Sequence, residues 1–110
     1  MKEIKEIKDE LDLDKALEHE TTVILKNSTR CGISRNALGE YRNFAEKTDK
    51  NAELYIINIL ENRKISDEIE KRTEIRHESP QLIIFKKGKP VWNISHWDIT
   101  ETEINDALER

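Results

Sequence analysis

The chain has 110 residues, which is the size of one domain with a single modest core, and no linker or repeat divides it. Its 19 basic and 23 acidic residues give a net charge of -4 and are interleaved, which argues against nucleic acid as a partner. No run approaches the roughly 18 consecutive apolar residues of a membrane span, and residues 1–11 lack the apolar core of a signal peptide. We therefore expect one domain over residues 1–110 in a soluble, cytoplasmic protein without a membrane partner.

The first quarter of the chain predicts a helix followed by a buried strand. Apolar residues at helical spacing predict a helix from Asp12 to His19, and Asp12 is placed to be its N-cap. The preceding residues 3–7 fit either a short edge strand or the start of a longer helix. Residues 21–26 place a continuous apolar run after two threonines, which is typical of a buried strand.

The middle of the chain repeats this alternation. After a polar turn at residues 27–29 and the cysteine at position 31, apolar residues on one helical face predict a second helix. These residues are Ala37, Tyr41, Phe44 and Ala45. Residues 54–60 predict a second buried strand, and a helix is expected over about residues 62–73.

The last third predicts a β-hairpin and a closing helix. Residues 81–85 and 90–94 are rich in strand-forming types, and the connection between them contains Gly88. Thr100 and Glu103 form a capping box at the start of the last helix. A β-α-β unit followed by a hairpin and a closing helix is the order of the thioredoxin fold. We therefore expect an α/β protein whose mixed central sheet is flanked by helices.

The only cysteine, Cys31, lies at the junction between the first buried strand and the following helix. A lone cysteine cannot form an internal disulfide, so any thiol chemistry involves another molecule. At a helix N-terminus the free backbone N–H groups stabilise the thiolate, which is the form that attacks disulfides, and Arg30 can add to this effect. The alternative is an inert buried cysteine.

Ser34 stands where a second cysteine would stand in a C-x-x-C pair. Its hydroxyl can donate a hydrogen bond to the thiolate but cannot resolve a mixed disulfide. Capping of the helix start is its other possible role. Without a resolving cysteine, the protein would exchange with a partner thiol and be reset by a second small thiol.

A proline directly precedes the strand predicted at residues 81–85. Proline is confined to the first position of such a strand or to a bend. If the fold assignment is right, a cis Ser79–Pro80 bond is expected, and this proline loop would lie beside Cys31 and pair through its backbone with a substrate chain.

Four stretches of the chain resemble the monothiol bacilliredoxin family, thioredoxin-like proteins of bacteria whose low-molecular-weight thiol is bacillithiol. The stretches are Ser28-Thr29-x-Cys31-x-Ile33-Ser34, Glu61-Asn62-Arg63, His77-Glu78-Ser79-Pro80-Gln81, and Val91-Trp92 through Ser95-His96-Trp97. The last of them is the more specific signal. Two residues beside the cysteine depart from the family's usual Thr-Cys-Pro-Ile-Ser, because Arg30 and Gly32 stand in place of Thr and Pro. Glycine frees the backbone that proline would fix, which affects loop rigidity and partner preference.

The resemblance implies a thiol-disulfide oxidoreductase that removes bacillithiol from protein mixed disulfides, with Cys31 taking the bacillithiol. It implies no bound cofactor, bacillithiol as the thiol co-substrate, and bacillithiolated proteins and a low-molecular-weight thiol as partners. Cys31 and Ser34 are then the catalytic residues. The residues expected to bind substrate are Arg30, Gly32, Ser79, Pro80, His96 and Trp97.

Other interpretations are possible. Cys-Gly-Ile-Ser is similar to the Cys-Gly-Phe-Ser motif of monothiol glutaredoxins, which carry an iron-sulfur cluster, but residues 92–94 replace the Gly-Gly pair of that family. A third possibility is a thioredoxin-like interaction module with an idle cysteine. No metal site is expected, because His19, His77 and His96 are not at metal-ligand spacing and are better explained as surface residues. A Cys-His hydrolase that uses His77 lacks a recognisable third member.

Overall fold

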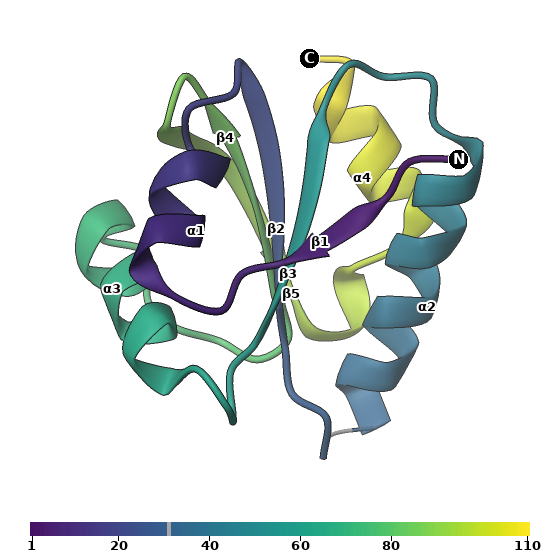
Figure 1. Ribbon diagram of the computed structural model, residues 1–110. Helices are drawn as coiled ribbons and strands as arrows, with labels where there is room; N and C mark the ends of the chain where they lie inside the picture. Colours follow the sequence, from purple (N-terminus) through teal and green to yellow (C-terminus); the bar gives the residue numbers. More distant parts are fainter. Residues whose placement is uncertain (31) are drawn as a thin grey trace.

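The computed structural model describes residues 1–30 and 32–110, and in this part of the chain a five-stranded sheet lies between two pairs of helices (Figure 1). In chain order the elements are β1 (Ile4–Glu6), α1 (Glu10–Ala16), β2 (Thr21–Asn27), α2 (Gly32–Lys47), β3 (Glu53–Asn58), α3 (Arg63–Thr73), β4 (Gln81–Lys86), β5 (Lys89–Ser95), a 3-10 turn η1 (His96–Asp98) and α4 (Glu101–Leu108). Among the described residues, none of the helices is long and apolar enough to cross a bilayer.

The sheet is mixed, as the sequence predicts, and its strand order is β1-β3-β2-β4-β5. The strands β1, β3 and β2 are parallel, whereas β4 is antiparallel to both β2 and β5. The carboxyl ends of β2 and β3 therefore lie at the same edge as the start of β4 and the end of β5. We call this the carboxyl edge of the sheet. It is the edge at which α2 and α3 begin.

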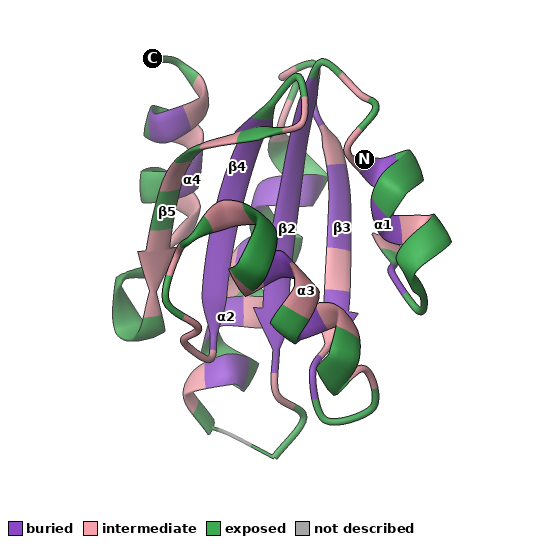
Figure 2. Cartoon of the chain, turned by 90° about the vertical axis from the view of Figure 1, so that its left-hand side faces the viewer, coloured by how far each residue is buried: buried purple, intermediate pink, exposed green. Residues whose placement is uncertain are grey.

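Each face of the sheet carries its own apolar core. The strand β2 is buried along its whole length, so its alternate residues enter the two cores (Figure 2). Val23 and Leu25 pack with residues of α2 and α4, among them Tyr41 and Phe44. Ile24 packs on the other face with residues of α1 and α3. Because both faces of β2 are covered, an apolar run rather than an alternating one forms this strand.

The elements occur in the predicted order, and the differences lie at their ends. The first helix runs from Glu10 to Ala16 rather than from Asp12 to His19. Its N-cap is Asp9, whose side chain accepts a hydrogen bond from the backbone N–H of Asp12 at 2.8 Å. Apolar spacing locates the face of a helix but not its first residue, which a polar cap decides. Residues 4–6 form the edge strand β1, the first of the two predicted alternatives.

One of the two hydrogen bonds of the capping box predicted for the last helix is present in the structure. The Thr100 side chain accepts a hydrogen bond from the backbone N–H of Glu103 at 3.1 Å. This bond satisfies one of the free N–H groups in the first turn of α4. The carboxylate of Glu40, on α2, accepts a second N–H there, from Glu101 at 2.8 Å.

Candidate active site

The segments that carry the predicted site residues meet at the carboxyl edge of the sheet. Strand pairing sets Lys26 opposite Gln81 and Gln81 opposite Ser95. As a result Pro80 and His96, which adjoin these positions, lie side by side, and the His96 backbone N–H donates to the Pro80 carbonyl at 3.0 Å. The predicted proline loop and the Ser-His-Trp segment are therefore neighbours, although they are far apart in the sequence.

Cys31 lies outside the described residues, so its role as the nucleophile stays a prediction. Its two sequence neighbours are both exposed, Arg30 in the turn after β2 and Gly32 as the first residue of α2. A Cβ built on Gly32 would meet no described atom within 4 Å. Steric crowding therefore does not explain why glycine stands where proline is usual in the family.

A hydrogen bond of Ser34 joins the start of α2 to the turn that follows β2. The Ser34 side chain is fully buried, and its Oγ accepts a hydrogen bond from the backbone N–H of Ser28 at 3.2 Å. This N–H belongs to the turn after β2 rather than to the helix, so the bond closes the loop and is not the helix cap that the sequence suggested. Because the hydroxyl accepts here, its own proton is still available for donation.

The proline loop has the predicted geometry at its centre, since the Ser79–Pro80 peptide bond is cis. Pro80 is buried and directly precedes β4. The Ser79 hydroxyl is buried and has no hydrogen-bond partner among the described residues. An unpartnered buried hydroxyl is uncommon in folded proteins.

His96 joins two parts of the carboxyl edge. Its backbone has a φ of 58°, in the left-handed region that residues other than glycine seldom adopt. Its Nδ1 lies 3.2 Å from the Glu78 carboxylate, so both its backbone and its side chain contact the proline loop. The next residue, Trp97, is 62% exposed and is therefore not a core residue. Trp92, in contrast, is half-buried and packs against the core under α2 and α4.

A network of asparagines accounts for part of the Glu61-Asn62-Arg63 motif. The Asn27 side chain at the end of β2 donates to the Asn58 side-chain oxygen at 3.0 Å. Asn62, the N-cap residue of α3, donates from its side chain to the Asn58 backbone carbonyl at 3.3 Å. These bonds join the ends of β2 and β3, so the motif orders the loop between β3 and α3.

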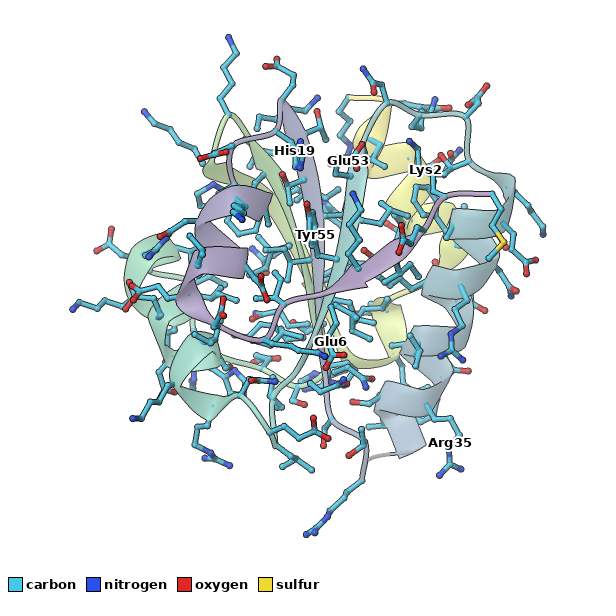
Figure 3. All side chains as sticks on the ribbon, in the orientation of Figure 1. Lys2, Glu6, His19, Arg35, Glu53 and Tyr55 are labelled. Atoms are coloured by element: carbon cyan, nitrogen blue, oxygen red, sulfur yellow. The ribbon has the colours of Figure 1, made fainter. Side chains whose placement is uncertain are left out.

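The helix ends at this edge favour negative charge. The first turns of α2 and α3 contain no acidic residue among those described, whereas α1 and α4 each have two. Arg35 adds a positive charge and points outward near the start of α2 (Figure 3). In the first turns of α2 and α3 no described acidic side chain offsets the free N–H groups and the helix dipole, and such a helix start favours a thiolate over a thiol.

The most unexpected residue of the edge is Lys26, which sequence analysis assigned only to a buried strand. Its side chain is fully buried, and its Nζ donates to the Gln81 side-chain oxygen at 3.2 Å. Gln81 in turn donates to the Arg76 carbonyl at 3.1 Å. Burial lowers the pKa of Lys26 to about 8. The signal in the sequence is a lysine that ends an apolar run.

The three histidines do not form one site, and they differ in burial. His96 is exposed, as the sequence predicts for a surface residue, whereas His19 and His77 are half-buried. His19 Nε2 lies 3.0 Å from the Tyr55 hydroxyl, toward the opposite end of the sheet from the start of α2 (Figure 3). His77 Nδ1 lies 3.2 Å from the Ser66 hydroxyl, and burial lowers the pKa of His77. Among residues 1–30 and 32–110 no group of three or more His, Cys, Asp or Glu side chains could hold a metal ion.

The architecture is that of the thioredoxin fold, and solved structures confirm this class. One described as a candidate oxidoreductase with a thioredoxin fold superposes with a TM-score of 0.88 at 29% identity, over 97% of this chain and 94% of that chain. A mutant thioredoxin from Halobacterium salinarum NRC-1 has a TM-score of 0.81 at 19% identity, over 97% and 88% of the two chains. Fasciola hepatica thioredoxin has a TM-score of 0.79 at 18% identity, over 97% and 98%.

The family is narrower than the fold. The family model described as monothiol bacilliredoxin BrxC matches residues 2–104. The chain therefore belongs to the monothiol bacilliredoxin family, within the thioredoxin-fold oxidoreductases. The resemblance noted in the sequence is confirmed.

Proposed function

We propose that this protein is a monothiol thiol-disulfide oxidoreductase that removes bacillithiol from protein mixed disulfides through Cys31. Its partners are then bacillithiolated proteins and a low-molecular-weight thiol, and it needs no bound cofactor. A cytoplasmic location, where thiols are kept reduced, fits this chemistry and the single cysteine.

The match of a monothiol family over residues 2–104 is the observation that carries the proposal. The carboxyl edge adds chemical support. Gly32, the residue after Cys31, begins α2, whose first turn has no acidic residue among those described. The buried Ser34 hydroxyl stands in that turn with a proton to donate. Both features favour a thiolate over a thiol.

The proposed reaction has two exchange steps. The Cys31 thiolate attacks the bacillithiol sulfur of a protein–bacillithiol disulfide, a new Cys31–bacillithiol disulfide forms, and the substrate protein leaves as a thiolate that takes up a proton. A second low-molecular-weight thiolate then attacks this disulfide, releases Cys31 as a thiolate, and leaves as a small disulfide. No net electron enters from a cofactor, because each step exchanges one disulfide for another.

The experiment follows the removal of bacillithiol from a model protein by intact-mass spectrometry. The wild type should remove the adduct and acquire the bacillithiol mass, whereas Cys31→Ala should do neither while retaining its fold by circular dichroism. A matched substrate carrying glutathione tests the identity of the small thiol. Equal activity of Cys31→Ala would contradict the enzyme proposal, and preference for the glutathione substrate would contradict the choice of bacillithiol.

The same protein preparation also tests the iron-sulfur alternative. Protein made anaerobically and offered iron and sulfide should stay colourless, because the chain lacks the Gly-Gly pair of the glutaredoxin motif at residues 92–94. A stable visible spectrum that disappears in Cys31→Ala would instead make cluster binding the leading function.

A further inference from the structure

Lys26 carries an ammonium group in a buried position, where the charged form is destabilised by the loss of water. It has no exposed surface, and among the described residues its Nζ has one hydrogen-bond acceptor, the neutral side chain of Gln81 at 3.2 Å. Moving an ammonium group out of water costs several kcal/mol, and well-packed apolar side chains usually replace such groups without loss of stability. A charge retained in this position therefore calls for a role beyond packing.

The two carboxylates that act on the pKa of Lys26 do not form an ion pair with it among the described residues. Asp67 and Glu70, both on α3, partly offset the effect of burial on its pKa. Glu70 is engaged elsewhere, because its carboxylate accepts the backbone N–H of His77 at 2.9 Å. The charge of Lys26 also reaches its neighbours, since after burial it is the next cause of the lowered pKa of His77, with a smaller contribution from Arg63.

The position of Lys26 connects this charge with the carboxyl edge. Lys26 is the second-to-last residue of β2, and the strand leads directly into the turn before α2. Ser28, two residues further on, donates its backbone N–H to Ser34 of α2 at 3.2 Å. The first turn of α2 is thus fastened to the strand end that carries Lys26. Gln81, opposite Lys26, directly follows the cis proline.

We propose that Lys26 is a positioning residue for thiol exchange, whose buried ammonium charge favours the thiolate at the carboxyl edge of the sheet. This inference rests on the proposed function in one respect, that Cys31 is the nucleophile. The charge adds to the potential of the α2 N-terminus, and burial strengthens it because water screens it less there than at the surface. Arg30 is exposed and is therefore screened more strongly.

A purely structural role predicts a different result. If Lys26 only held Gln81, and through it Arg76 and the proline loop, then breaking the bond from either side would have the same effect. Gln81→Met breaks the same hydrogen bond and keeps the charge. Lys26→Met and Lys26→Gln both remove the charge, and glutamine retains a polar group that can reach Gln81.

The test measures the pKa of the Cys31 thiol, from thiolate absorbance and from the pH dependence of alkylation by iodoacetamide. Lys26→Met and Lys26→Gln should each raise this pKa by about one unit, which is about tenfold less thiolate well below the pKa. Lys26→Arg should restore the wild-type value, and Gln81→Met should leave it unchanged. Lys5→Met removes an equal charge from β1 at the far side of the sheet and should also leave it unchanged.

An unshifted thiol pKa in both neutral Lys26 variants would overturn the proposal, as would an equal shift in Gln81→Met or Lys5→Met. If Lys26→Met does not fold, Lys26→Gln carries the test alone. None of these measurements uses bacillithiol. A shifted thiol pKa in a protein that ignores bacillithiolated substrates would therefore uphold the role of Lys26 while rejecting the proposed substrate.

Discussion

Two of the largest fully buried side chains among the described residues, those of Tyr41 and Lys26, are polar, and they lie on opposite faces of the sheet. Tyr41 reaches from α2 into the backbone of β3, where its hydroxyl accepts from the Tyr55 N–H at 3.0 Å and donates to the Tyr55 carbonyl at 2.9 Å. The Val23 carbonyl of β2 is also within 3.2 Å. Lys26 on the other face has one neutral acceptor at 3.2 Å.

The two residues differ in their effect on stability: the Tyr41 hydroxyl stabilises the fold, whereas the buried charge of Lys26 destabilises it. Burial raises the pKa of Tyr41, so its hydroxyl remains neutral and fully hydrogen-bonded at any ordinary pH. Burial lowers the pKa of Lys26 to about 8, so at neutral pH the folded protein still holds a charge that its surroundings disfavour. A hydrogen-bonded neutral group is explained by packing alone, whereas the buried charge of Lys26, close to the proposed site, is not.

The largest expected effect is on the pH dependence of the free energy of unfolding, and it is due to Lys26. Its pKa is about 8 in the folded protein against an ordinary value of 10.5, so between these pH values the unfolded chain binds more protons. The free energy of unfolding should therefore rise with pH across this range, by about 3 kcal/mol relative to Lys26→Met. Urea unfolding of both proteins at several pH values measures this difference.

The variant Lys5→Met is the control for the pH dependence of stability, because it also removes one lysine charge from the sheet. The hydrogen bond of Lys5 with Glu53 raises the pKa of Lys5, so the sign is opposite: its contribution to stability is present below the ordinary pKa and is lost as the pH rises past the folded one. A difference between wild type and Lys26→Met that stays flat from neutral pH to 10.5 would show that Lys26 is solvated in the folded protein.

A smaller loss is expected from Tyr41→Phe, which tests the other half of the comparison. Removing the hydroxyl leaves the Tyr55 backbone groups buried without that partner, which should lower the free energy of unfolding by about 2 kcal/mol at every pH. The thiol pKa should not change. Tyr55→Phe is a matched control, because among the described residues the Tyr55 hydroxyl has a hydrogen bond only with the half-buried His19, and its removal should cost less stability. Equal losses in the two variants would contradict the special role of Tyr41.

Ser34→Ala should have the smallest effect on stability, because the Ser34 side chain makes a single hydrogen bond among the described residues. The same hydroxyl is also proposed to take part in the reaction, so two effects are expected. Losing the bond to Ser28 should lower the free energy of unfolding by about 1 kcal/mol, and losing the proposed hydrogen bond to the Cys31 thiolate should slow exchange several-fold without abolishing it. Stopped-flow rates and urea unfolding measure the two effects separately. An unchanged exchange rate would leave Ser34 with loop closure alone.

The sequence by itself determined the order of the elements and the place of the proposed site in that order. Periodicity is a local property, so the apolar runs at residues 21–26 and 54–60 identified the two buried parallel strands without any knowledge of their partners. The C-x-x-S motif is local too. Its position after the first of these strands located the predicted site at the start of the following helix. The cis bond at Ser79–Pro80 was also foreseen, because the fold assignment required it.

Only the tertiary structure decided which polar groups meet at that site. Lys26 and Gln81 are 55 positions apart, and it is the antiparallel register of β2 and β4 that sets them opposite each other. His96 contacts Glu78 for a similar reason, through the register of β5. Register depends on how both faces of the sheet are packed, and each strand's own sequence is compatible with several registers. A lysine at the end of an apolar run therefore becomes a buried charge only when a second strand and a helix cover it.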